Sequence, residues 1–272
     1  MSELDKFKGK GLPGMTGTSM PATVERPRLP WEGTKSKPSE TAEAVLNRKR
    51  GHFAIALDGT ASMTPLIDMA KATIKKIMSR VIAEAKSPVQ VQLFVFRDYD
   101  VEQLLVEQSR LSAEANELSA WLNGIMATGG GANNGEAIEQ VLLAIQKAGD
   151  FDAVLLAGDE PYNSRGDLDQ RGRGDVPTAA DLARRFGQGK CPIHTFLVGS
   201  YVDARRALQE LASLSGGCFG QLDGSDAMID MAVLAMLAGL KGRAFVKDYM
   251  ERTALSHSGK EFGTLLLKGP GS

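Results

Sequence analysis

The chain has 272 residues, of which 43% are hydrophobic and 24% are charged, a composition typical of a globular protein. Its 32 basic and 33 acidic residues give a net charge of −1, which supplies no overall attraction to nucleic acid or to an anionic membrane. Two cysteines are too few for a disulfide framework. The most apolar run, residues 231–240, is too short to span a bilayer, and the N-terminus lacks the apolar core of a signal peptide. We therefore expect a cytoplasmic protein that binds neither nucleic acid nor membrane.

Three regions of different composition divide the chain. Residues 1–45 are rich in Gly, Pro, Ser and Thr, with Trp31 as the exception, and such a segment is expected to be flexible because it cannot bury enough apolar surface. Residues 50–242 carry regular apolar patterns and are predicted to form the folded domain. Residues 243–272 are predicted to be a C-terminal extension with one possible strand at Thr264–Leu267.

From residue 50 onward, apolar segments typical of strands alternate with segments of helical periodicity. The predicted strands are 52–57, 89–96, 101–108, 151–157, 193–198 and 218–222. The predicted helices are 63–85, 112–125, 136–148, 178–186, 204–214 and 225–240. The third strand follows the second after a short acidic link, so it can pair only antiparallel and belongs at a sheet edge. The whole pattern predicts an α/β fold with a mostly parallel central sheet, one antiparallel edge strand and helices on both faces.

A polar motif follows the first predicted strand. The apolar run 53–57 ends at Asp58, Thr60 and Ser62 follow at alternate positions, and Pro65 begins a long helical pattern. These three side chains should therefore lie in a strand-to-helix loop at the carboxyl edge of the sheet, where ligands bind in such folds. One carboxylate and two hydroxyls are hard oxygen donors, which suit Mg²⁺ or Mn²⁺.

Two further loops are expected at the same edge. The first is the glycine-rich segment 128–135, and the second follows the most apolar strand and contains Asp159. With these loops, residues 50–242 resemble a von Willebrand factor A (vWA) domain with a metal-ion-dependent adhesion site (MIDAS). In that family a D-x-S-x-S motif follows the first strand and an Asp closes the fourth. Here Asp58-x-Thr60-x-Ser62 and Asp159 match those positions, with Thr in place of the first Ser.

The second loop departs from the family pattern. When it is aligned on Gly135-Glu-Ala-Ile, the ligand position falls on Ala132 or Asn133 instead of a Thr or Asp. Asn133 could offer its amide oxygen, or Thr128 could reach back from before the glycines. The metal ligands implied by the resemblance are therefore Asp58, Thr60, Ser62 and Asp159, with Asn133 and Thr128 as alternatives for the second loop.

The resemblance implies a binding module rather than an enzyme. A divalent cation open on one side would be completed by a Glu or Asp carboxylate of a partner protein. The sequence resembles intracellular bacterial members of the family, including those encoded beside tellurium-resistance, phage-defence and ATPase-chaperone genes, which implies an adaptor or scaffold in a multiprotein system. This role is inferred by analogy with proteins of the same family, and not from the chemistry of a site in this sequence.

Two alternatives remain open at this point. Leu57-Asp-Gly-Thr60 is similar to part of the D-x-D-G-T motif of haloacid dehalogenase-type phosphohydrolases, but the position of the nucleophilic Asp is Ala56, so no aspartyl-phosphate could form. The other alternative is a metal-free structural vWA domain. Arg97 and Asp98, at the end of the second predicted strand, either border the site or form an ion pair at the sheet edge.

Overall fold

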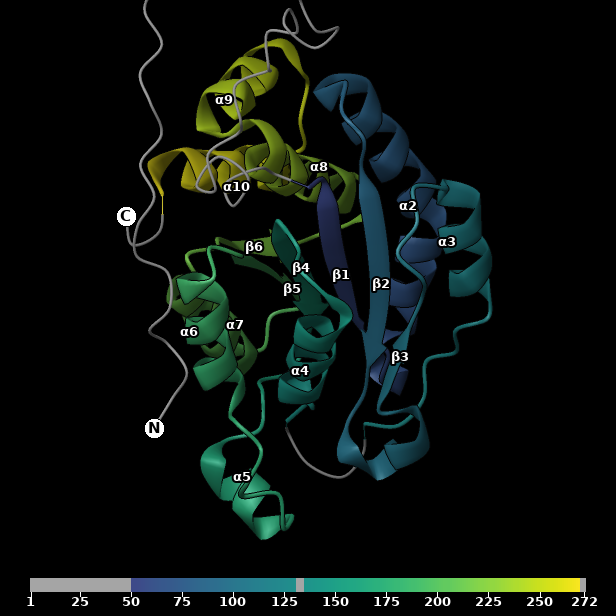
Figure 1. The fold of residues 1–272 in the computed structure, drawn as a ribbon, viewed down its shortest axis with the longest axis vertical. Coiled ribbons are helices and arrows are strands. Elements are labelled where there is room, and N and C mark those ends of the chain that lie inside the picture. Colours follow the sequence, from purple (N-terminus) through teal and green to yellow (C-terminus); the bar gives the residue numbers. More distant parts are fainter. Residues whose placement is uncertain (1–49, 131–134, 270–272) are drawn as a thin grey trace, which may run out of the picture. The chain divides into compact units, whose positions relative to one another are not determined.

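A computed structural model describes residues 50–130 and 135–269, and these contain one six-stranded sheet in the order β3-β2-β1-β4-β5-β6 (Figure 1). All neighbouring strands are parallel except β2 and β3, which are antiparallel. The predicted fold class, including its antiparallel edge strand, is confirmed. The strands are β1 His52–Asp58, β2 Gln90–Phe96, β3 Val106–Gln108, β4 Ala153–Gly158, β5 Ile193–Val198 and β6 Phe219–Leu222.

Helices cover both faces of the sheet (Figure 1). The α-helices are α2 Thr64–Ala85, α3 Ala115–Asn123, α4 Ile138–Ala148, α5 Arg165–Gln170, α6 Ala179–Gln188, α7 Val202–Ser215, α8 Ser225–Lys241, α9 Arg243–Arg252 and α10 His257–Lys268. Two 3₁₀-helices, η1 Ala61–Met63 and η2 Tyr99–Leu104, follow β1 and β2. Pro65 lies in the first turn of α2 as predicted. Within the described residues, no helix combines the length and apolar character needed to cross a membrane.

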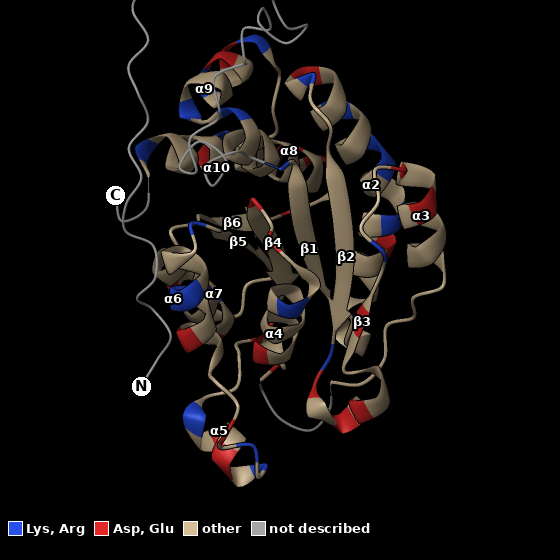
Figure 2. Cartoon of the chain, viewed as in Figure 1, with Lys and Arg blue, Asp and Glu red and all other residues tan. Residues whose placement is uncertain are grey.

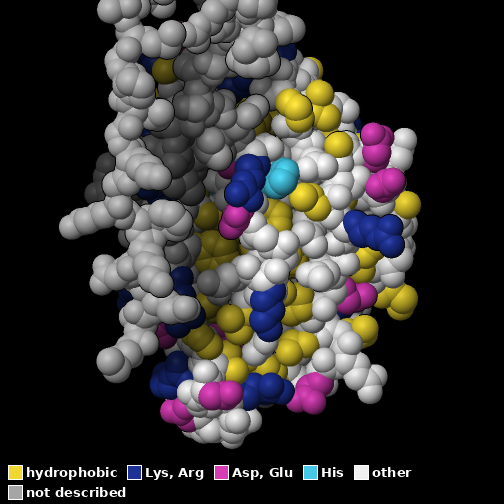
Figure 3. Space-filling view, in the orientation of Figure 1, with side chains coloured by type: hydrophobic (Ala, Val, Ile, Leu, Met, Phe, Trp, Pro, Cys, Tyr) yellow, Lys and Arg dark blue, Asp and Glu magenta, His cyan; other side chains and the backbone are white. Residues whose placement is uncertain are grey.

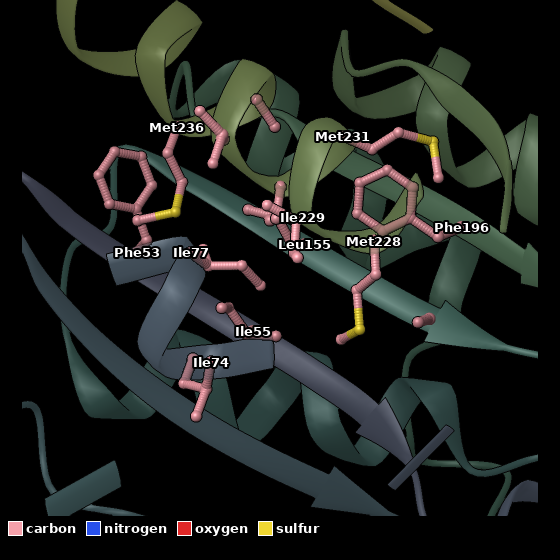
Figure 4. Packing of buried hydrophobic residues seen from close by; sticks show 14 of the residues in the cluster. Phe53, Ile55, Ile74, Ile77, Leu155, Phe196, Met228, Ile229, Met231 and Met236 are labelled. Atoms are coloured by element: carbon pink, nitrogen blue, oxygen red, sulfur yellow. The ribbon is translucent and has the colours of Figure 1, made fainter. Parts of the chain in front are cut away.

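Alternate residues of the central strands face two separate cores, because side chains of a strand point to opposite sides of the sheet. Phe53, Ile55 and Leu57 of β1 pack with α2, α3 and α8 on one face. Ala54 and Ala56 face the other core, which α4, α6 and α7 close. Figure 4 shows methionines of α8 directed toward Phe53 and Phe196 in the first core. With both faces covered, ligands can reach β1 and β4 only at the ends of the strands.

Two predicted elements near the sheet edge are shorter or different in the structure. The strand predicted at 101–108 is mostly the 3₁₀-helix η2, and only Val106–Gln108 pairs with β2. The predicted helix 112–125 begins only at Ala115. Ser112 lies before it, where its hydroxyl donates to Glu117 Oε2 and accepts from the Glu114 N–H. The polar loop 163–177 contains the short helix α5, which Ser164 and Asp167 begin with reciprocal side-chain to backbone hydrogen bonds.

The strand predicted at Thr264–Leu267 is wrong. These residues lie in α10, where Phe262 and Leu266 are buried in the core beside α8. Glycines at 259 and 263 lower helix propensity, but they also allow close packing, because a Cβ at Gly263 would lie 2.4 Å from the Met250 sulfur. The described residues belong to one compact unit, which includes α9 and α10.

The surface carries mixed charge. On the part of the face described in Figure 3, basic and acidic side chains stand among apolar ones and no patch of a single sign is visible. The large exposed apolar side chains come from several elements: Ile82, Leu104, Met126, Tyr201, Val202 and Leu265.

Candidate functional site

Asp58 ends β1 and is fully buried. Its Oδ1 accepts hydrogen bonds from the Thr60 backbone N–H at 2.9 Å and from the Thr60 hydroxyl at 2.7 Å. The Thr60 hydroxyl also lies 3.3 Å from the Ser62 hydroxyl, which is on the exposed side of η1. The three side chains of the predicted motif are therefore joined in one hydrogen-bonded chain that runs from the buried sheet edge to the surface.

The glycine-rich loop lies directly beside this motif. The Thr128 N–H donates to the Gly59 carbonyl at 2.9 Å, and the Ala61 N–H donates to the Gly129 carbonyl at 3.0 Å. A Cβ at Gly130 would lie 2.7 Å from the Thr60 Cβ, so only glycine permits this approach. Within the described residues the Thr128 hydroxyl makes no hydrogen bond. Its role as a ligand stays a prediction.

The other second-loop candidate, Asn133, lies outside the described residues.

Asp159 follows β4, the strand next to β1, and its negative charge raises the pKa of Asp58. Oδ2 of Asp58 and Oδ1 of Asp159 are buried and have no hydrogen-bond partner within the described residues. Gly158 leaves space at this point, because a Cβ there would contact Asp58 Oδ2 at 3.4 Å. The first and third loops of the predicted site are thus brought together, while the function of Asp58, Thr60, Ser62 and Asp159 as metal ligands stays a prediction.

Glu136 is a member of this cluster that the sequence did not predict. It precedes α4, is 3% exposed, and its Oε2 has no hydrogen-bond partner among the described residues. Burial raises the pKa of the Asp58 carboxyl, and the charge of Asp159 adds to this against the opposing hydrogen bonds of Thr60. Burial likewise raises the pKa of Glu136, with Asp58 as the largest charge contribution. Both shifts show that negative charge is unfavourable here without a compensating cation.

Three more acids border the cluster. Burial raises the pKa values of Asp98, Glu139 and Glu160, and each has one buried oxygen that no described residue binds. Tyr99 donates its hydroxyl to Glu139 Oε1 at 2.8 Å. Figure 2 shows acidic segments at this end of the sheet, with basic segments of the α5 region nearby.

Within the described residues, no basic side chain forms an ion pair with Asp58, Asp159 or Glu136. Arg97 is buried, but it pairs with Glu107 of β3 at 2.7 Å and binds the Leu104 and Met126 carbonyls. Arg171 lies 3.5 Å from Asp98 Oδ2. The sequence had left open whether Arg97 and Asp98 border the site or form an edge ion pair; Arg97 forms the ion pair, and Asp98 borders the acids.

A hard divalent cation fits the donors present at this edge. Two unpartnered buried carboxylate oxygens and two linked hydroxyls stand at the end of β1, and such oxygens are costly to bury without a partner. In the described part of the chain, no three His, Cys, Asp or Glu side chains converge as the ligands of one ion. The set therefore matches a cation that takes few carboxylates and retains part of its water, as Mg²⁺ does.

Comparison with known proteins supports the architecture. No protein-family model matches the sequence, and no curated protein matches it. Solved structures do match, with low identity. The pilus adhesin SpaC from Lactobacillus rhamnosus GG has a TM-score of 0.50 at 14% identity, over 71% of this chain and 31% of that one. At this low identity the likeness concerns the fold alone.

Two other solved structures were found to be similar to this chain. A von Willebrand factor type A protein from Catenulispora acidiphila has a TM-score of 0.48 at 14% identity, over 71% of this chain. Proximal thread matrix protein 1 from the mussel byssus has a TM-score of 0.49 at 15% identity, over 71% of this chain, and its MIDAS motif is occupied by zinc. This chain spans 43% and 46% of their respective lengths.

Proposed function

We propose that this vWA domain is a divalent-cation-dependent protein-binding module. The observation that carries the proposal is a pair of buried oxygens on Asp58 and Asp159, which have no partner among the described residues and lie beside the linked hydroxyls of Thr60 and Ser62. Mg²⁺ or Mn²⁺ held there would be liganded by these side chains and would satisfy the unpartnered oxygens. Its remaining coordination would be open toward solvent at Ser62, since that residue is exposed.

The proposed partner presents a Glu or Asp carboxylate. A hard cation prefers an anionic oxygen to a neutral one, and a partner carboxylate would approach over the loops that follow β1 and β4. Glycines at 129 and 130 leave this approach free of side chains. The rest of the glycine-rich loop, residues 131–134, is outside the described residues.

We propose binding rather than catalysis. A phosphohydrolase of the haloacid dehalogenase type would need a nucleophilic carboxylate two residues before Asp58. Position 56 is a fully buried alanine that packs in the core on the α4 side of the sheet. The phosphohydrolase alternative therefore lacks its nucleophile at the required position.

The metal part of the proposal is tested by thermal unfolding. A ligand that binds only the folded state at 100 times its Kd adds about 2.7 kcal/mol of stability, so Mg²⁺ or Mn²⁺ should raise the melting temperature by roughly 5–10 °C. Asp58→Ala should abolish this rise. Asp150→Ala is the matched control, because Asp150 is an exposed acid at the amino end of β4 that pairs with Arg50. An equal rise in Asp58→Ala would show that the cation binds elsewhere, and no rise in the wild type would favour a metal-free structural domain.

The partner part of the proposal competes with binding through the chain ends. Strand addition by Thr264–Leu267 is no longer available, because that segment is helical in α10. Trp31 and the rest of residues 1–45 lie outside the described residues and remain a competing surface. Partner affinity measured with EDTA, with Asp58→Ala and with residues 1–45 removed separates the two surfaces. Affinity that survives the first two changes but falls on truncation would overturn metal-dependent binding.

The cellular role is proposed from the sequence resemblance alone. We propose an adaptor or scaffold in a bacterial stress-resistance or phage-defence system, within the cytoplasm. Co-purification with Mg²⁺ present, repeated with EDTA, would identify the metal-dependent partner and thereby test this placement.

A further inference from the structure

Hydrogen bonds join the main chain at Glu136 and Ala137 to the segments that follow β2 and β4, the two strands beside β1. Its N–H donates to the Pro161 carbonyl at 2.8 Å, and the Asn163 side-chain amide donates to the Glu136 carbonyl at 2.9 Å. The following residue, Ala137, donates its N–H to the Arg97 carbonyl at 3.3 Å. Because β1 lies between β2 and β4, these bonds hold Glu136 across the end of the strand that carries Asp58.

The Glu136 side chain is buried at this place without a partner. It is 3% exposed, and no described residue donates a hydrogen bond to its Oε2. Asp58 is the charged group that acts on it most strongly, followed by Asp98 and Asp159, and all three have the same sign. A helix-start glutamate with only a structural role would point to solvent or bind a donor. Glu136 does neither, so its ionised form would need a cation that the described side chains do not supply.

We propose that Glu136, two residues before α4, is the third acidic group of the cation site. The inference rests on the proposed function, because it assumes a divalent cation beside Asp58. Three acids do not converge here as direct ligands within the described residues. Glu136 therefore acts as a positioning residue, through its charge and by accepting hydrogen bonds from water held at the site.

The inference makes two predictions of opposite sign for Glu136→Gln. Loss of the charge should weaken Mg²⁺ and Mn²⁺ affinity at least tenfold, a change typical for loss of a residue that positions the ligands of a metal. The same change removes a buried like charge from beside Asp58, so the melting temperature of the metal-free protein should rise. A glutamate that is only structural would give a lower melting temperature and an unchanged cation affinity.

The experiment is calorimetric titration of the full chain with MgCl₂ and MnCl₂, together with thermal unfolding in EDTA. Glu139→Gln is the matched control: it is also a buried glutamate, but it lies inside α4, Tyr99 binds its Oε1, and the charge that acts on it is that of Asp98, not of Asp58. Its cation affinity should stay within about threefold of the wild type. Glu136→Asp keeps the charge and should retain most of the affinity that Glu136→Gln loses.

The outcomes separate the inference from the function on which it rests. Wild-type affinity in Glu136→Gln, together with loss of binding in Asp58→Ala, would overturn the inference and leave the cation site in place. No binding of either cation by the wild type would overturn both. Equal losses in Glu136→Gln and Glu139→Gln would also overturn the inference, because the effect would then not depend on the position of Glu136.

Discussion

Buried acids stand at both edges of this sheet, and their surroundings are opposite. At the amino edge, Asp152 is 8% exposed, and its two carboxylate oxygens accept hydrogen bonds from the Gly51 N–H at 2.6 Å and the Arg50 N–H at 3.3 Å. At the carboxyl edge, Asp58 and Asp159 each keep a buried oxygen that no described residue binds. The same residue type is therefore fully bound at one edge of the sheet and only partly bound at the other.

Asp230 is a second buried acid with a hydrogen-bond donor to each carboxylate oxygen, so Asp152 is not a single case. Asp230 of α8 is 4% exposed, and its oxygens bind Arg80 at 2.8 Å and the Ser256 N–H at 2.7 Å. Where this protein buries a carboxylate for structure, it supplies a donor to each oxygen. Asp58 and Asp159 differ from these two acids, because each has a buried oxygen that no described residue binds. Buried polar groups without partners are expected at functional sites.

Asp152→Ala should produce the largest change in stability. It leaves the buried Gly51 N–H without an acceptor, and hydrogen bonds to a charged group contribute about 1.5–3 kcal/mol each. We expect a loss of about 3 kcal/mol in the free energy of unfolding, measured by urea denaturation in EDTA.

Asp58→Asn is the comparison at the opposite edge. It keeps an acceptor for Thr60 and removes a like charge from beside Asp159, so the metal-free protein should be as stable as the wild type or more stable. A loss as large as that of Asp152→Ala would mean that both edges bury their acids for structure alone.

A smaller effect is expected from Glu139, which should make the free energy of unfolding depend on pH. Burial raises the pKa of this carboxyl to about 7 from 4.5, so the folded protein retains the proton to higher pH than the unfolded chain does. The free energy of unfolding therefore falls as pH rises from about 4.5 through 7. Between pH 5 and 8 the wild type should lose about 2 kcal/mol relative to Glu139→Gln, since one pKa unit is about 1.4 kcal/mol.

Buried His194 changes stability in the other direction. Burial lowers its pKa to about 4 from 6.5, so its contribution to stability is lost as pH falls from about 6.5 through 4. This loss is common to both proteins and cancels in their difference. Urea denaturation in EDTA across this range measures the difference, and parallel curves for the two proteins would contradict a raised pKa for Glu139.

One physical reason allowed the sequence to predict both the sheet and the placement of Asp58 and Asp159 at the same edge. Strong apolar runs such as 53–57 specify buried strands, and in a parallel sheet the residue that ends each run must lie at the carboxyl edge. This places Asp58 and Asp159 together without knowledge of any contact between them. The short helix α5 could also have been found, because Ser164 and Asp167 have the spacing of a capping box.

Glu136 and Glu139 could not be recognised in the same way. In sequence they stand at the start of an amphipathic helix, where an exposed acid that favours the helix dipole is expected. Their burial depends on residues 161–163 and on Tyr99, which are distant in sequence. One pattern in the sequence could have indicated their burial: Glu136 and Glu139 lie three positions apart among apolar residues, directly after the glycine-rich loop. α10 was missed because its two glycines weaken the helical pattern that Phe262 and Leu266 form.

Ser62→Ala should have the smallest effect and tests the exposed end of the site. The Ser62 hydroxyl is exposed and its one described contact is the Thr60 hydroxyl at 3.3 Å, so stability in EDTA should change by less than about 0.5 kcal/mol. Cation affinity should fall by about threefold to tenfold, because one neutral oxygen donor is lost while Asp58 and Asp159 remain. Thr64→Ala is the matched control, since that hydroxyl is also exposed but donates to the Ala61 carbonyl at 3.0 Å, away from the acids. Calorimetric titration of both variants with MnCl₂ separates the two positions. An equal fall in Thr64→Ala would show that the start of α2 matters only for folding of this loop, and that Ser62 does not face the cation.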